Sequence, residues 1–129
     1  MAAGCLLVPI LSGIGAPPAG DSEIKKLLKE RQATAAKIYD MSKKSFMAGE
    51  VGHDEMLHAQ GALLRAKLAV CDSKDDRVKV HGEMVEVAKQ MVELIKSQAE
   101  TANVSQIEVL KAQVQLFDVQ IGLAQAEAE

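Results

Sequence analysis

Aromatic residues are almost absent from this chain of 129 residues. It contains no tryptophan, and Tyr39, Phe46 and Phe117 are its only aromatic side chains. A globular core of this size normally buries several large rings, because each ring removes much apolar surface from water. Alanine, leucine, valine, lysine, glutamate and glutamine are common instead, which is typical of helices that approach one another closely. The composition therefore predicts an all-α protein.

An excess of one charge sign is also lacking. The net charge is −3, and both signs are interspersed along the chain. Without a basic block or rings on which bases could stack, nucleic acid is excluded as a partner. Glycine-rich phosphate loops are missing, and a thin helical array offers little concavity in which catalytic groups could gather. We therefore predict a non-enzymatic protein with no cofactor and no evident small-molecule substrate.

Cysteine is scarce, with only Cys5 and Cys71. Cys5 lies in an N-terminal segment that we expect to be removed, so the remaining cysteine cannot form a disulfide within the chain. Cys71 lies on an apolar stripe, where we expect a buried small hydrophobe rather than a reactive thiol.

The first 20 residues carry no charged side chain. An apolar run over residues 5–11 is followed by small residues and Pro17-Pro18. This pattern resembles a secretory signal with cleavage after Ala16, although it lacks the usual early lysine or arginine. The run is too short to span a bilayer. We expect export to the periplasm, with membrane association only through this leader; the alternative is a disordered leader on a cytoplasmic protein.

Residues 21–129 are predicted to form one helical coiled-coil domain. Asp21 or Ser22 should cap a first helix over 22–48, and Gly49 should close it in the left-handed conformation. The turn 49–52 is so short that the next helix must fold back antiparallel. A last helix is expected over 105–127. The apolar residues at helical spacing in the first and last helices are Ile24, Leu27, Leu28, Ala35, Ile38, Met41, Met47, Ile107, Leu110, Val114, Phe117, Ile121 and Ala124.

The segment 53–101 carries an apolar residue at every seventh position, which is typical of a helix packed on other helices. The repeat consists of Leu57, Leu64, Cys71, Val78, Val85, Val92 and Ala99. It passes from Cys71 to Val78 in register, which favours one continuous central helix of about 73 Å. The alternative is a four-helix bundle broken near Asp72-Ser73, where Ser73 and Asp76 could form an N-cap pair.

The two predicted turns repeat one another. Val51 matches Val104, an offset of 53 residues, and the same offset relates Glu55 to Glu108 and Leu57 to Leu110. Ser105 and Glu108 have the spacing of a capping box. The pattern indicates a duplicated helical hairpin over about 36–73 and 89–126. The tip residues are Gly49, Val51, Gly52 and Glu55 in the first hairpin, and Asn103, Val104, Ser105 and Glu108 in the second.

The two tips resemble those of outer-membrane efflux proteins of the TolC family. The segments are Gly49-Glu50-Val51-Gly52-His53-Asp54-Glu55-Met56-Leu57-His58-Ala59-Gln60 and Ala102-Asn103-Val104-Ser105-Gln106-Ile107-Glu108-Val109-Leu110-Lys111-Ala112-Gln113. The family has such turns on long periplasmic helices and assembles as trimers. This chain is far shorter and lacks the alternating strands of a membrane barrel. The resemblance implies a stand-alone periplasmic hairpin unit.

The strongest candidate metal ligands are His53, Asp54 and His58. Asp54 and His58 are one turn apart and could share a helix face, whereas His53 points in another direction. A periplasmic metal-binding or metal-sensing hairpin protein is therefore the alternative function. We expect instead that these histidines lie on the surface and that no metal is bound.

The apolar positions of the second half of the central helix are wider than one coiled-coil stripe. Leaving such a face in water would expose a larger apolar patch than soluble monomers usually tolerate. We therefore predict a homo-oligomer, or a helical partner in the bacterial envelope. The predicted oligomer face comprises Met84, Val85, Ala88, Met91, Val92, Ile95 and Ala99.

Overall fold

The computed structural model describes residues 17–101 and 103–129. Within these ranges the chain forms four helices, α2 (Pro17–Met47), α3 (His53–Val70), α4 (Lys74–Glu100) and α5 (Gln106–Glu127), and no strand. The prediction of an all-α protein is confirmed. Residues 1–16 of the predicted leader lie outside the described residues, whereas 17–20 belong to α2. Asp21 and Ser22 lie inside that helix, so the prediction that either residue caps it is wrong.

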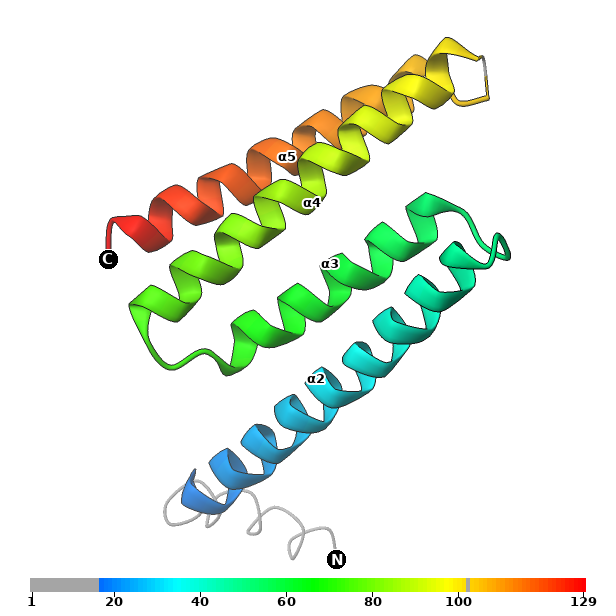
Figure 1. Ribbon diagram of the computed structural model, residues 1–129. Helices are drawn as coiled ribbons and strands as arrows, with labels where there is room; N and C mark the ends of the chain where they lie inside the picture. Colours follow the sequence, from blue (N-terminus) through cyan, green and yellow to red (C-terminus); the bar gives the residue numbers. More distant parts are fainter. Residues whose placement is uncertain (1–16, 102) are drawn as a thin grey trace, which may run out of the picture.

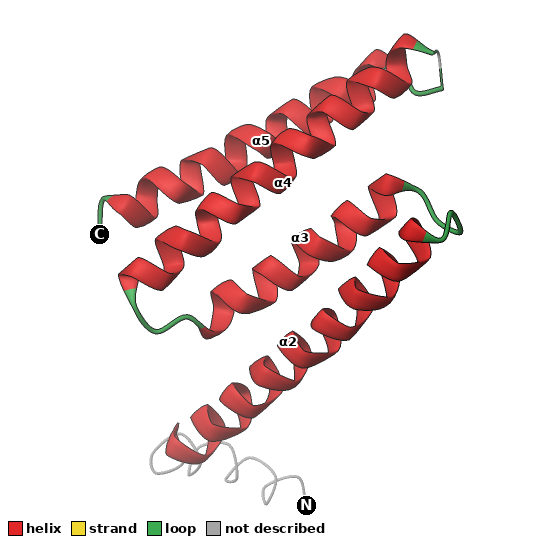
Figure 2. Ribbon diagram, viewed as in Figure 1, coloured by secondary structure: helices red, strands yellow, loops and turns green. Residues whose placement is uncertain are grey.

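The four helices lie side by side in one row, and the chain reverses direction at each connection (Figures 1 and 2). Among the described residues, α2 packs on α3, α3 on α4 and α4 on α5, and no other pair of helices is in contact. α3 and α4 therefore each have two neighbours. The outer helices, α2 and α5, each have only one.

The prediction of a continuous central helix over 53–101 is wrong. α3 ends at Val70, and α4 begins at Lys74 after a short connection. Ser73 adopts an extended conformation, and its hydroxyl oxygen accepts a hydrogen bond from the backbone N–H of Asp76 at 3.1 Å. This N-cap satisfies a donor that a new helix would otherwise leave without a partner. The local capping signal therefore prevails over the seven-residue repeat.

The repeat survives the break because it serves two different contacts. Leu57, Leu64 and Cys71 lie in or against the cluster between α3 and α4. Val85 and Val92 are buried outside that cluster, and α5 is the remaining neighbour of α4. The repeat therefore packs on α4 before the break and on α5 after it. A single straight helix would keep the whole repeat on one side.

The first turn closes as predicted. Gly49 has a φ of 77°, and its N–H donates to the carbonyl of Phe46 at 3.0 Å. The N–H of Glu50 donates to the carbonyl of Ser45 at 2.8 Å, which completes a Schellman motif. Gly52 is the N-cap of α3, as expected from the sequence.

The second turn differs in detail from its prediction. Ser105 is the N-cap of α5, but its side chain accepts no capping hydrogen bond. The carboxylate of Glu108 pairs with Lys111 at 3.4 Å instead of reaching back to the cap. The predicted capping box is therefore not formed. A hydrogen bond from the backbone N–H of Glu108 to the backbone carbonyl of Ser105 closes the first turn of α5 instead.

The predicted oligomer face on α4 is covered within the chain. Val85, Met91 and Val92 are buried, and Met84 and Ile95 pack against the cluster shared with α3. Ala88 and Ala99 are half-buried. The face is wide because α4 has a neighbour on each of two sides, α3 and α5.

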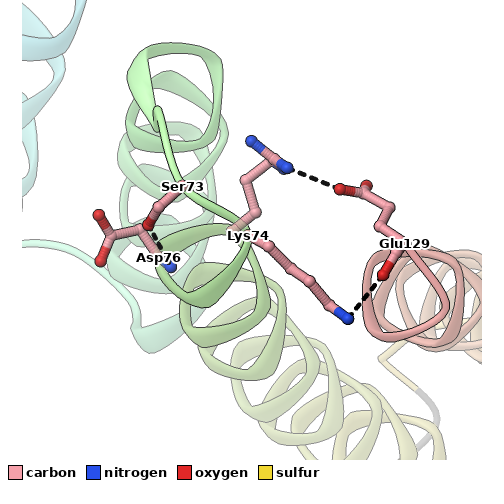
Figure 3. A network of polar contacts seen from close by, with 5 residues as sticks. Ser73, Lys74, Asp76 and Glu129 are labelled. Carbon is pink, nitrogen blue, oxygen red and sulfur yellow. Dashed lines mark hydrogen bonds and ion pairs between the residues drawn. The ribbon is translucent and has the colours of Figure 1, made fainter.

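A polar clasp joins the start of α4 to the end of α5 (Figure 3). Lys74 Nζ donates to the backbone carbonyl of Glu129 at 2.7 Å, and Arg77 pairs with the Glu129 carboxylate at 2.6 Å. Both side chains of the ion pair are partly exposed, so the pair contributes at most about 1 kcal/mol. The clasp aligns the ends of the two helices without dominating their stability.

Spin labels at positions 50 and 103 should be close to each other. The two connections lie at the same end of the row (Figure 1), so we expect a distance of about 20–30 Å, two to three helix spacings. Double electron–electron resonance on a Cys5→Ser, Cys71→Ser background, diluted with unlabelled protein, would measure it. A continuous helix over 53–101 requires roughly 73 Å, and a distance of that size would contradict the fold.

Replacing Val92 by aspartate should unfold the α4–α5 contact. The side chain is 5% exposed, so a carboxylate there would be buried without a partner. We expect the free energy of unfolding to fall by about 3 kcal/mol or more in urea titrations followed by circular dichroism. Gln90→Asp, at an exposed position of the same helix, is the control and should cost less than about 0.5 kcal/mol. Equal losses in the two variants would show that Val92 is not part of the core.

Candidate functional site

The exposed large apolar side chains of the described residues all lie on the two outer helices. Each is at least 52% exposed. We define the α2 face by Ile24, Leu27, Ile38 and Met41, and the α5 face by Ile107, Leu110, Val114, Phe117 and Ile121. Met47, at the end of α2, is also exposed. No comparable residue of α3 or α4 is exposed, because both helices are covered on two sides.

α5 carries two apolar stripes on opposite sides. The α5 face recurs at intervals of three and four residues, which is the spacing of a coiled-coil seam. A second stripe follows it by two residues, or about 200° around the helix. This second stripe is buried or half-buried and consists of Val109, Ala112, Leu116, Val119, Leu123 and Ala126. One stripe of α5 is thus covered by α4, and the equivalent stripe opposite is open to solvent.

α2 shows the same arrangement with a smaller angle between its stripes. Its half-buried stripe, which faces its only neighbour α3, includes Leu28, Ala35, Tyr39 and Phe46. The α2 face precedes this stripe by one residue, or about 100° around the helix. Arg31 and Thr34 occupy the two polar positions within the α2 face. The helix at each edge of the row therefore has one apolar stripe packed within the chain and another exposed to solvent.

A shallow groove over α4 is the main alternative site. It is lined by three helices, and His58 and Arg65 of α3 and Asp118 of α5 are its charged or titratable members. These three side chains are exposed, and no polar or charged side chain among the described residues is buried. Groups in water cannot provide the dry, preorganised surroundings on which acid–base catalysis depends. The groove therefore supports no catalytic assignment.

The candidate metal ligands are not brought together. The His53 ring stacks on Phe46 of α2, with ring centroids 4.9 Å apart. His58 lines the groove over α4. Across residues 17–101 and 103–129, no three histidine, cysteine or carboxylate side chains are positioned to hold a metal ion. His53 and His58 thus have separate surroundings.

His81 is the other histidine that the structure places inside an interface. Its Nδ1 atom is buried and has no hydrogen-bond partner among the described residues. The ring lies against Gly122 of α5, where an added Cβ would come within 3.2 Å of it. Gly122 therefore provides the space that lets α5 approach α4 around this ring.

Cys71 is half-buried at the end of α3, and its Sγ donates to the carbonyl of Lys67 at 3.3 Å. Burial, aided by the carboxylates of Asp76 and Asp72 and opposed by Arg77, raises the pKa of this thiol. A raised pKa keeps the sulfur protonated and poorly nucleophilic at neutral pH. The thiol thus acts as a small packing residue beside the α3–α4 connection.

Comparisons with protein-family models, curated proteins and solved structures give no match for this chain. The likeness to efflux-protein tips therefore rests on the residues of the two turns alone. Within the part of the chain that the structure describes, no helix is both long enough and apolar enough to cross a bilayer.

The α2 and α5 faces are among the apolar positions that the sequence places at helical spacing. The structure exposes those of the last helix from Ile107 to Ile121 to solvent. The missed signal is the second stripe, which begins at Val109. Two stripes on one helix predict two neighbours, and the row supplies only one.

Cys71 should react slowly in the folded protein. In a Cys5→Ser variant, we expect iodoacetamide at pH 8 to alkylate Cys71 about tenfold more slowly in buffer than in urea, because the raised pKa and burial limit the thiolate. The folded-state pKa exceeds that of the unfolded chain, so this thiol's contribution to stability is complete at neutral pH and is lost as the pH rises above about 9. Equal alkylation rates in the folded and unfolded protein would contradict the placement.

Proposed function

We propose that this protein is a non-enzymatic interaction protein of the bacterial envelope, built from two antiparallel coiled-coil hairpins. The α2 and α5 faces pack on helices outside the chain's own row. One observation carries the proposal: the exposed large apolar side chains of the described residues are confined to the two edges of the row. Scattered apolar residues on a surface need no explanation, whereas a continuous stripe of them does.

The spacing of the faces identifies the kind of surface that covers them. A stripe with intervals of three and four residues fits the side-chain holes of another helix. Burying a leucine, isoleucine or phenylalanine side chain contributes about 1.5–3 kcal/mol, and the α5 face presents five large apolar side chains. Helix packing at these edges would therefore bury apolar surface that the row leaves exposed to water, and this burial would stabilise the assembly.

The assignment to the envelope draws on two features of the sequence. The uncharged N-terminal segment resembles a secretory leader, and the two turns resemble the tips of efflux-channel hairpins. The two tips lie at the same end of the row (Figure 1), so a partner could contact both of them together. We propose that the hairpins act as a docking unit of this kind, either with further copies or with a helical envelope protein.

Site-specific photocrosslinking in the native cells would test the proposal. A photoreactive phenylalanine analogue at position 117 of α5, or at position 41 of α2, should form crosslinked species under ultraviolet light, because both positions belong to the faces. The same analogue at position 86, an exposed site on α4, is the matched control and should give at least about tenfold less product, because no partner helix lies beside it.

Two results would overturn the proposal. The first is the absence of crosslinks at both 117 and 41 in cells that express the protein at its normal level. The second is equal crosslinking at position 86, because it would show that contact is unrelated to the apolar faces. The proposal does not specify the partner, and the mass of the crosslinked product would identify it.

A further inference from the structure

We infer that the α5 face of one copy packs on the α2 face of a second copy. This contact would repeat between copies the contact that α3 makes with α4 inside the chain. The inference rests on the proposed function, because it names the partner of the same two faces.

The internal repeat relates a buried face of α3 to the exposed face of α5. With the offset of 53 residues, Leu57 corresponds to Leu110. Leu57 is 1% exposed between α3 and α4, whereas Leu110 is 52% exposed. Leu64 and Leu68, which lie in or against the same cluster, correspond in the same way to Phe117 and Ile121. α5 therefore presents to solvent the face that α3 buries on α4.

The other half of the contact is repeated at the opposite edge. α4 contributes Val80, Met84, Val87, Met91, Leu94 and Ile95 to the cluster that it shares with α3. Reduced by the same offset, these positions are Leu27, Arg31, Thr34, Ile38, Met41 and Ser42. Leu27, Ile38 and Met41 belong to the α2 face, whose fourth member, Ile24, corresponds to Arg77. Ile38 and Met41 lie within the duplicated segment, and the same offset is extended beyond that segment to reach Leu27. The chain thus carries one half of an α3–α4-type contact on each edge, and a second copy supplies the missing half to both.

The register inside the chain predicts the register between copies. α3 and α4 run in opposite directions (Figure 1), and Leu57 and Gly61 of α3 line one groove with Met84, Val87 and Met91 of α4. We take the antiparallel register in which Leu57 faces Met91 and Gly61 faces Val87. Transferred to α5 and α2, this register brings the exposed apolar side chains together. The facing pairs are Ile107 with Met41, Leu110 with Ile38, Val114 with Thr34, Phe117 with Arg31, and Ile121 with Leu27.

Charge supports the same register. Arg31 is the one charged residue that interrupts the α2 face, and its guanidinium would come beside Phe117 and the carboxylate of Asp118. A guanidinium between an aromatic ring and a carboxylate is favourably placed. Inside the chain, the position equivalent to Asp118 is Arg65 of α3, and the position equivalent to Arg31 is Met84 of α4. Met84 carries no charge, so that contact needs no carboxylate. Lys37 and Lys111 also approach each other, but at the solvent-exposed rim, where like charges are screened.

Such a contact joins two different surfaces, so each copy can bind one copy on either edge. Contacts of this kind produce a closed ring, or a filament if the rotation does not close. They differ from a two-fold dimer in which α5 would meet α5, or α2 would meet α2. The two possibilities differ in the helices that are in contact between copies: α5 with α2 in one case, and each helix with its own equivalent in the other.

Mixed disulfide crosslinking would separate them. On a Cys5→Ser, Cys71→Ser background, purified Leu110→Cys protein mixed with Ile38→Cys protein should form crosslinked dimers under mild oxidation, because the two Cβ atoms face each other. Leu27→Cys in place of Ile38→Cys is the control. It lies three turns, about 16 Å, along α2 and should give at least about fivefold less product.

Each other outcome has a clear meaning. Efficient dimers of Leu110→Cys protein alone would show a two-fold contact and overturn the inference. A protein that is monomeric and uncrosslinked in pure form, yet crosslinks through position 117 to a different protein in cells, would overturn it while leaving the proposed function standing. Failure of both experiments would defeat both proposals.

A charge exchange tests the register without new cysteines. Asp118→Arg should weaken self-association by about tenfold in sedimentation experiments, because it opposes Arg31. Adding Arg31→Asp should restore most of the loss, since it recreates the pair in reversed order. Circular dichroism would verify that both variants remain helical, as expected for substitutions at two exposed positions. Folded variants in which the second change restores nothing would contradict the register.

Discussion

A helix with two apolar stripes requires two neighbours, and this requirement shapes the whole molecule. α4 meets it inside the chain, with α3 on one side and α5 on the other. α5 has a second apolar stripe with the same spacing on the side turned away from α4, at the edge of the row. The edges of the row therefore expose apolar stripes of the kind that pack helix against helix inside it. Stability and proposed function depend on one kind of interaction.

The short connection at residues 71–73 makes the row possible. With α3 and α4 joined in one rod, the second hairpin would point away from the first and the cluster around Leu57 and Met91 could not form. The Ser73 hydroxyl supplies the cap at the start of α4, and Lys74 and Arg77 in the same turn hold the end of α5. One turn of helix thus sets both the reversal of the chain and the alignment of the second hairpin.

The core explains why so few aromatic residues are needed. Its members are leucine, valine, alanine and methionine, and alanines such as Ala59, Ala66 and Ala112 are buried where helices meet. Small side chains let helix axes approach closely, and Gly122 accommodates the His81 ring in the same way. Phe117, one of the three aromatic residues, lies on the exposed α5 face rather than in the core. A large ring on an exposed apolar face is typical of a contact surface.

Local signals in the sequence determined much of this protein. The composition and the helical spacing predicted an all-α fold, and Gly49 marked the first turn because few other residues adopt its left-handed conformation. The Ser73–Asp76 cap is also present in the sequence, but the seven-residue repeat favours a continuous helix, because a repeat does not show which neighbour each segment faces. Only the tertiary structure decided that Met84–Ala99 is covered and that Ile107–Ile121 is exposed. The physical reason is that periodicity shows how many faces a helix has, whereas the arrangement of the whole row decides which of them find a partner within the chain.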